Sequence, residues 1–210
     1  MTRLASLTAS LTAALAAAVL LASISSAAAD TIIAGGILPG ANNTWTAAGS
    51  PYILQGDVTV PATATLTIQA GVEVRATSNS DSQGSGLNPS RVELIIDGAL
   101  DVNGTAASPV TFHSSSTSSG SWYGVLVNPG ATSVSFEHAV IQHANYGVIS
   151  DAPGTVLAAA NLTVQLASSH GLLLRAGEAI KTQRAQASQE LPSLHEESPM
   201  GSGFRAGHST

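Results

Sequence analysis

The sequence predicts an all-β solenoid, a right-handed single-stranded parallel β-helix of about six coils, in which each coil is one turn of the chain. Short apolar runs that begin with glycine recur at Gly124, Gly147 and Gly171, at an almost constant interval. Ile141-Gln142 recurs as Val164-Gln165 at the same interval. A repeat with a period of about 23 residues indicates one structural unit stacked on the next.

The composition favours β-structure and excludes several classes of protein. Of the 210 residues, 44% are hydrophobic, 10% are charged and 4% are aromatic, and 20 are glycine. Helix bundles need more Glu, Lys, Arg and Leu, and disordered chains combine low hydrophobicity with high net charge. The net charge of −6 and the single lysine, Lys181, argue against a nucleic-acid partner, which needs a basic surface.

The N-terminus has the pattern of an export signal. A basic start is followed by an Ala- and Leu-rich run over residues 4–24, and Ala27 and Ala29 place small residues at both recognition positions before Asp30. This predicts a secretory signal peptide over residues 1–29, cleaved after Ala29. The alternative is an uncleaved anchor, because the apolar run approaches the roughly 20 residues that span a bilayer. We expect a secreted or cell-surface protein with no membrane span after cleavage and, since it has no cysteine, no disulfide.

Seven short strands are predicted between residues 50 and 115, each rich in β-branched residues and bounded by Gly, Pro or Asn. They cover residues 52–54, 58–60, 66–68, 72–74, 92–96, 100–102 and 110–112. Strands this short also fit a β-sandwich or barrel, but only stacked coils require a fixed period.

We therefore expect one β-helix domain over residues 30–175 whose inward side chains stack from coil to coil. Val125, Val148 and Leu172 should lie above one another. Ile141 should likewise lie on Val164. Burial of each such side chain is worth about 1.5–3 kcal/mol, so that every coil adds to a continuous core.

The order of the strands and turns resembles that of a known family. The matching segments are Ser50-Pro51-Tyr52, Gly56-Asp57-Val58-Thr59-Val60, Leu66-Thr67-Ile68, Gly71-Val72-Glu73-Val74, Gly98-Ala99-Leu100, Asn103-Gly104-Thr105, Pro109-Val110-Thr111-Phe112 and Trp122-Tyr123-Gly124-Val125. Over residues 45–175 the chain resembles bacterial right-handed parallel β-helix proteins of the pectin-lyase-like kind. The resemblance implies the fold. It implies no single activity, because this fold hosts polysaccharide lyases and hydrolases, adhesin-type passengers and other surface proteins.

The resemblance also implies what an active site would need. Similar lyases use a basic residue with a cation or metal, yet the repeat region has no lysine and its arginines are scattered. Similar hydrolases use two carboxylates on one outer face. The catalytic candidates are Glu73 and Asp101, each the outward residue of an apolar-polar-apolar triplet after a glycine. Their spacing exceeds one period, so they would stack only if the insertion between them adds about five residues to a coil. Solvated outward positions are the favoured interpretation.

Two segments contain side chains of the kinds that bind metals. Residues 79–84 have oxygen-bearing side chains at alternate positions, as in a calcium loop, but Ser90 stands where a Glu is wanted, so a flexible surface loop is predicted. His138 and His143 lie beside Glu137, but their odd spacing points them to opposite faces of a continuous strand. No metal and no cofactor are predicted.

The sequence favours a non-catalytic, exported β-helix that serves as a surface, adhesion or scaffold module. The apolar residues recur from coil to coil, whereas no reactive residue recurs with them. Its partners would be carbohydrate or other cell-surface components. The alternative is a carbohydrate-active enzyme, a polysaccharide hydrolase or lyase, or an incomplete remnant of one.

Residues 176–210 are predicted to differ from the coils. The apolar pattern stops near Gly177, and charged residues become frequent. One hypothesis is a helix over residues 178–190 that caps the last coil and covers its open edge. The other is a disordered tail on a β-helix truncated at its C-terminus.

Overall fold

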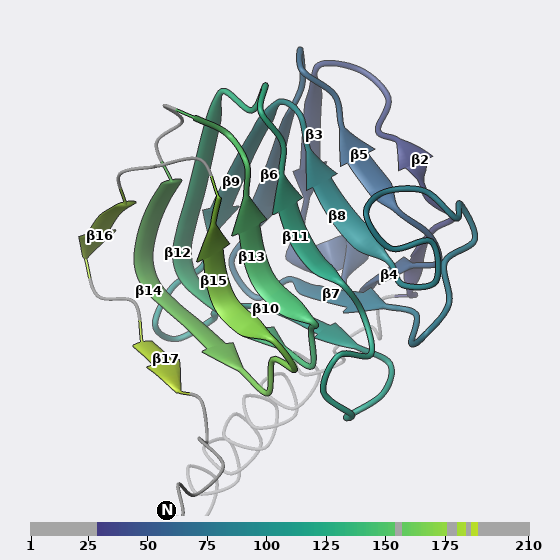
Figure 1. Cartoon of the computed structure of the whole chain (residues 1–210). Helices are drawn as coiled ribbons and strands as arrows, with labels where there is room; N and C mark the ends of the chain where they lie inside the picture. Colours follow the sequence, from purple (N-terminus) through teal and green to yellow (C-terminus); the bar gives the residue numbers. More distant parts are fainter. Residues whose placement is uncertain (1–28, 154–156, 176–179, 184–185, 189–210) are drawn as a thin grey trace, which may run out of the picture.

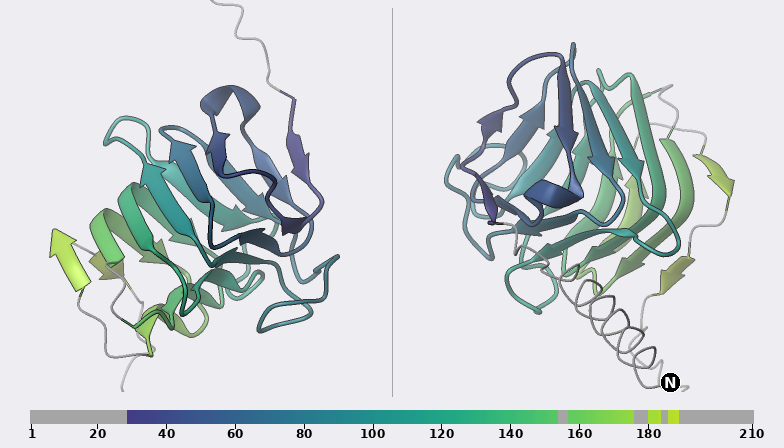
Figure 2. Two further views of the ribbon diagram at one scale, coloured as in Figure 1. Left: turned by 90° about the horizontal axis from the view of Figure 1, so that it is seen from above. Right: turned by 180° about the vertical axis from the view of Figure 1, so that it is seen from behind.

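Nearly all of the described chain that has regular structure is β-strand, and every paired strand runs parallel to its neighbour. The computed structural model describes residues 29–153, 157–175, 180–183 and 186–188. The strands form an 11-stranded and a six-stranded sheet that wind about one axis, from purple N-terminal coils to yellow-green C-terminal ones (Figure 1 and Figure 2). The chain is therefore an all-β parallel β-helix, as its repeat predicts.

Each coil contributes strands to three faces. Face 1 consists of β2 (Gly36–Ile37), β5 (Val58–Val60), β8 (Glu93–Ile96), β11 (Gly124–Val127), β13 (Tyr146–Ser150) and β15 (His170–Leu174). Face 2 consists of β3 (Asn42–Trp45), β6 (Thr65–Gln69), β9 (Ala99–Asn103), the first halves of β12 (Ser133–Gln142) and β14 (Leu157–Gln165), and β16 (Ile180–Gln183). Face 3 consists of β1 (Thr31–Ile33), β4 (Tyr52–Leu54), β7 (Glu73–Ala76), β10 (Val110–Ser114), the second halves of β12 and β14, and β17 (Gln186–Ser188). A short 3-10 helix, η2 (Ala47–Gly49), precedes β4. The six strands of face 1 correspond to the predicted six coils.

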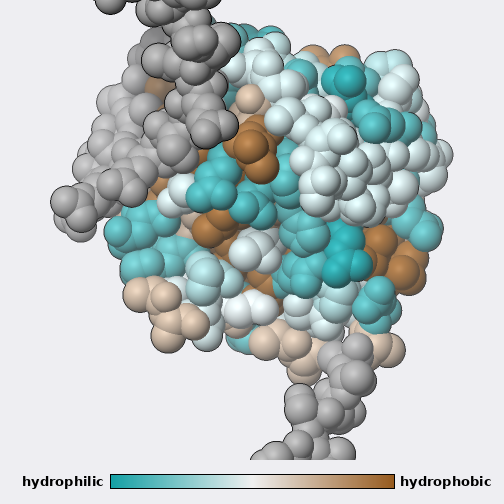
Figure 3. All heavy atoms as spheres, turned by 90° about the horizontal axis from the view of Figure 1, so that it is seen from below, coloured by the Kyte–Doolittle hydropathy of each residue, from teal (hydrophilic) through white to brown (hydrophobic). Residues whose placement is uncertain are grey.

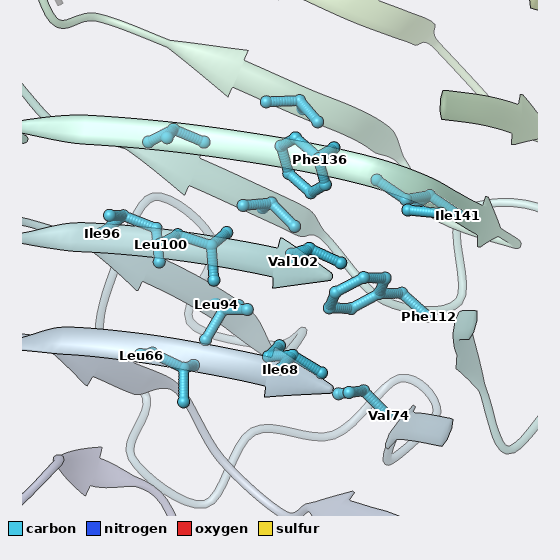
Figure 4. Packing of buried hydrophobic residues seen from close by; sticks show 14 of the residues in the cluster. Leu66, Ile68, Val74, Leu94, Ile96, Leu100, Val102, Phe112, Phe136 and Ile141 are labelled. Atoms are coloured by element: carbon cyan, nitrogen blue, oxygen red, sulfur yellow. The ribbon is translucent and has the colours of Figure 1, made fainter. Parts of the chain in front are cut away.

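The core consists of inward ladders that run along the axis (Figure 4). On face 1 Val125 pairs with Val148, and Val148 pairs with Leu172, which confirms the predicted ladder. On face 3 the ladder continues from Ile141 to Val164, also as predicted. Inward apolar residues at every second position, as in β6, β9 and β10, are what allows one coil to lie directly on the next.

Glycine opens the apolar runs because the next coil leaves no room for a side chain there. A Cβ placed on Gly124 would collide with the backbone carbonyl of Tyr146, and Gly124 has φ +133°. A Cβ on Gly147 would collide with the carbonyl of Gly171 and lie 2.6 Å from a methyl of Val164. The regular spacing of these glycines therefore reflects a close approach of successive coils at one corner.

The bends of the long strands β12 and β14 use non-glycine residues in left-handed conformations. His138 (φ 45°) and Asn161 (φ 56°) occupy equivalent bends where face 2 becomes face 3. His143 (φ 61°) and Leu166 (φ 54°) do so directly after face 3 ends. Asn and His are among the residues that tolerate this region best. The two histidines are thus corner residues of the coil.

Two insertions disturb the period in the middle of the chain. On face 1 Val58 pairs with Leu94 and Leu94 pairs with Val125, so both of these coils are longer than the coils that follow them. The first interval contains the segment 77–92 and the second the segment 115–123, both of which leave the coil as loops. Loop insertion at a corner is compatible with stacking, because the strands on either side keep their register.

The coil pattern continues past Arg175. Leu157 pairs with Ile180 and Thr163 pairs with Gln186, so β16 and β17 keep the same period and continue the sixth coil, which β15 begins. The described segments 180–183 and 186–188 are therefore strands, and the helix predicted over residues 178–190 is wrong there. Backbone pairing with β14 sets their conformation, although their sequence lacks an apolar pattern. Residues 189–210 lie outside the described part of the chain, as does most of the predicted signal peptide.

No helix within the described residues is long and apolar enough to cross a membrane.

Candidate functional site

The outer side of face 3 carries a charged cluster at β7 and β10, which we call the Glu73 cluster (Glu73, Arg75 and His113). Arg75 Nε donates to Glu73 Oε1 at 2.9 Å, and a second guanidinium nitrogen contacts the same oxygen. His113 Nε2 lies 2.9 Å from this oxygen. Register explains the meeting, because Arg75 and His113 are direct partners in the parallel ladder. The cluster ties two coils together.

Opposing influences act on the pKa of Glu73. Partial burial raises this pKa, but the hydrogen bonds and charges of Arg75 and His113 outweigh burial, and the pKa lies below its usual value. Glu73 is therefore an ionised hydrogen-bond acceptor at neutral pH and cannot serve there as a proton donor. An acid whose pKa is lower in the folded than in the unfolded chain stabilises the fold at a pH above its unfolded pKa. It loses that contribution as the pH falls through its folded pKa.

Replacing Glu73 by glutamine is expected to reduce the free energy of unfolding by less than about 1 kcal/mol at neutral pH, because solvent screens a partly exposed ion pair. The difference should shrink in acid, as the wild-type carboxylate takes up its proton at a pH below the usual range for Glu. Urea unfolding of both proteins in neutral and acidic buffer measures it. The exposed acid Glu137 supplies the control, Glu137→Gln, which should match wild type at neutral pH. A Glu73→Gln deficit that grows in acid would contradict the expectation.

The second candidate acid, Asp101, lies on face 2 and has partners of its own. Ser135 Oγ donates to Asp101 Oδ1 at 2.6 Å, and Asn103 Nδ2 donates to Asp101 Oδ2 at 2.9 Å. Asp101 is in register with Ser135, whereas Glu73 is in register with Thr111, which lies beyond Asp101 in the sequence. Glu73 and Asp101 would stack only if the insertion lengthened the coil by about five residues, and the coil that follows Glu73 is longer than that. The structure therefore does not stack the two candidate acids.

Sequence reasoning missed a buried acidic cluster between coils. Asp57 precedes β5 and Glu93 begins β8, and these residues are 1% and 0% exposed. The Glu93 N–H donates to Asp57 Oδ1 at 2.6 Å. Asp81, in the insertion, accepts the Asp57 N–H at 3.0 Å. The sequence does contain a signal, because Glu93 is an acid inside the apolar run 92–96. Without the neighbouring coil, however, such a residue is expected to point outward into solvent.

The insertion expected to be a flexible loop is anchored by Asp81. Its carboxylate accepts the N–H groups of Asp57, Gln83 and Ser85 at 3.0, 2.9 and 3.1 Å. Asp side chains commonly stabilise turns by such local bonds. Among the residues the structure describes, no group of three or more His, Cys, Asp or Glu side chains is placed to hold a metal ion.

The two histidines considered as metal ligands lie at different corners. His138 Nε2 is 3.3 Å from the amide nitrogen of Asn161 at the molecular surface. His143 is buried, and burial together with the charge of His113 lowers its pKa. They therefore do not form a pair.

The underside of the rod, where β7 and β10 lie in Figure 1, carries hydrophilic residues across its middle with separate apolar spots (Figure 3). On this face the side-chain amide of Gln142 donates to Gln165 at 2.9 Å. Together with the Glu73 cluster these groups form a row of donors and acceptors from coil to coil. Such a surface can bind polar ligands through hydrogen bonds.

The three-faced coil, its apolar ladders and its loop insertions define a parallel β-helix repeat protein. Residues 40–156 match the family model described as a pectate-lyase-like β-helix domain. This match covers more than half of the sequence, and the chain belongs to that family, in agreement with the resemblance seen in its motifs. Comparison with curated proteins and with solved structures finds no match in either group.

Proposed function

We propose that the protein is an exported, non-catalytic β-helix that acts as a surface, adhesion or scaffold module. One observation carries the proposal: Glu73 and Asp101 are on different faces, each held by structural partners. Hydrolysis of a glycosidic bond by two acids needs carboxyl groups about 5–10 Å apart that face the same bond. The placement of these acids supports a structural role for both.

The outer faces supply groups suited to hydroxyl-rich partners such as carbohydrate or other cell-surface components. Thr67, Asp101 and Ser135 form one row on face 2. Gln142 and Gln165 form another on face 3. Hydroxyl, carboxylate and amide groups together offer both donors and acceptors, as a polar ligand requires.

Export is supported by the position of the predicted cleavage site. Ala29 and Asp30 are exposed and stand immediately before β1, which begins at Thr31. Cleavage after Ala29 would therefore leave every described strand intact. We expect the exported chain to begin at Asp30, which its intact mass measures directly.

A carbohydrate-active enzyme is the second candidate, and the Glu73 cluster is the observation that favours it. His113 places a titratable nitrogen beside the cation Arg75 on an outer face. A base and a cation near each other are what proton abstraction from an acidic sugar requires. In the present geometry both are engaged by Glu73.

A screen of the purified chain against acidic and neutral polysaccharides distinguishes the two candidates when binding and product release are both measured. We expect binding without released oligosaccharides. Product release that disappears in His113→Ala but persists in His170→Ala, an exposed histidine on face 1, would support the enzyme instead. Absence of binding to every polysaccharide would remove carbohydrate as the partner.

A further inference from the structure

The insertion 77–92, which we call the strap, fastens three successive coils together beside β8 (Figure 1). In the first coil the Ser82 hydroxyl donates to the carbonyl of Ala34 at 2.7 Å. In the second, the Ser82 N–H donates to the carbonyl of Gln55 at 3.0 Å. In the third, the strap leads into Glu93. It therefore lies along the axis rather than around it.

The far end of the strap is held by carboxylates. Glu93 Oε1 accepts the N–H groups of Leu87 and Asn88 at 3.0 and 2.8 Å, and Glu93 Oε2 lies 2.9 Å from the same Leu87 nitrogen. The Ser85 hydroxyl donates to Asp57 Oδ2 at 2.7 Å. These bonds fix the strap segment 85–88 to two residues that are almost completely buried.

Negative charge is concentrated at this attachment. A Cβ on Gly86 would collide with Glu93 Oε2 and lie 2.9 Å from Asp57 Oδ2, so both carboxyl groups crowd one α-carbon. Within the described residues neither carboxyl takes part in an ion pair. The other titratable groups that act on Glu93 or respond to it are Asp81 of the strap and the neutral phenol of Tyr123.

We propose that the strap is a pH-sensitive fastening, closed in mild acid and released as the medium becomes alkaline, so that it couples or uncouples the first three coils. In mild acid the Glu93 carboxyl holds its proton and accepts the strap N–H groups without a charge of its own. Ionisation of the second carboxyl places two negative charges in a site where no described residue forms a compensating ion pair, which favours release of residues 85–88.

The direction follows from linkage. Burial, reinforced by the charges of Asp57 and Asp81 and opposed by the N–H groups of Leu87 and Asn88, raises the pKa of Glu93 to about 7. Burial likewise raises the pKa of Asp57. A group whose folded pKa is raised stabilises the closed state below its unfolded pKa, and this contribution is lost as the pH rises through about 7.

Hydrogen exchange of the full chain, read by mass spectrometry and corrected for the intrinsic pH dependence of exchange, tests the proposal at about pH 5.5 and about pH 8.5. We expect protection of strap peptides that contain Leu87 and Asn88 to fall by roughly tenfold or more at the higher pH. In Glu93→Gln, which keeps the acceptor oxygen but cannot ionise, protection should be the same at both pH values. Unchanged protection in wild type, or an undiminished fall in Glu93→Gln, would overturn the proposal.

Two further variants keep the test decisive. Asp101→Asn changes an acid on face 2, away from the strap, and should retain the wild-type fall in protection. Gly86→Ala places a methyl group against Glu93 and should leave the strap weakly protected at both pH values. This variant tests the attachment independently of whether Glu93→Gln folds. A strap that stays protected in acid in Gly86→Ala would show that the Gly86 attachment does not hold it.

Discussion

Replacing Phe112 by alanine is expected to reduce the free energy of unfolding by about 3–5 kcal/mol. Phe112 is 0% exposed and lies between Val74 and Ile141 in the inward ladder of face 3. Its ring meets that of Phe136 edge to face, with centroids 6.4 Å apart. The coils on both sides are held by their own backbone ladders, so they cannot collapse into the cavity, and the cost should lie toward the upper part of the range.

Urea unfolding followed by circular dichroism measures this loss. Thr111→Ala is the matched control, because Thr111 is the neighbouring residue on β10 and points outward. It should change stability by no more than about 0.5 kcal/mol. A Phe112→Ala protein within about 1 kcal/mol of wild type would mean that the ladder adjusts to fill the space.

Replacing Gly124 by alanine should be comparably severe, although it adds only one methyl group. The new Cβ would collide with the backbone carbonyl of Tyr146, and at φ +133° an L residue is strained in any surroundings. Strain costs about 1–3 kcal/mol, and overpacking adds a similar amount. The expected loss is therefore about 3 kcal/mol or more.

Substitutions at two other glycines distinguish the cost of backbone strain from the cost of the steric clash. Gly40 has φ +73° with nothing within 4 Å of an added Cβ, so Gly40→Ala measures backbone strain alone. At Gly130 the nearest atom would be 3.7 Å away and the backbone is not left-handed, so Gly130→Ala should be close to neutral. Thermal or urea unfolding should rank the losses as Gly124→Ala, then Gly40→Ala, then Gly130→Ala. Equal losses at Gly124 and Gly40 would contradict a clash between coils.

The sequence was a reliable guide where each coil repeats the one before. Val125, Val148 and Leu172 could be aligned correctly because parallel stacking converts a sequence period directly into a spatial ladder. The glycine-led runs recur with the same period for the same reason. This alignment needed no knowledge of the loops that interrupt the coil, since no insertion lies between these residues.

The polar residues could not be placed in this way. The separation of Glu73 from its partner strand depends on the length of the inserted loop, so the spacing between Glu73 and Asp101 in the sequence carried no information about their faces. The burial of Asp57 and Glu93 was not predicted, because the strap that buries them is itself polar. Strands β16 and β17 were missed because pairing with β14, rather than an apolar pattern, defines them.

The all-β parallel coil, its regular period and its inward ladders were predictable from the amino-acid sequence, because they follow from the alternation and recurrence of apolar residues. Which acids meet became clear only from the folded coils. The tertiary structure joined Glu73 to His113 and Asp57 to Glu93, and it separated Glu73 from Asp101. The reason is that contacts between charged side chains depend on register across insertions of variable length, whereas the inward position of an apolar residue follows from the alternation along its own strand.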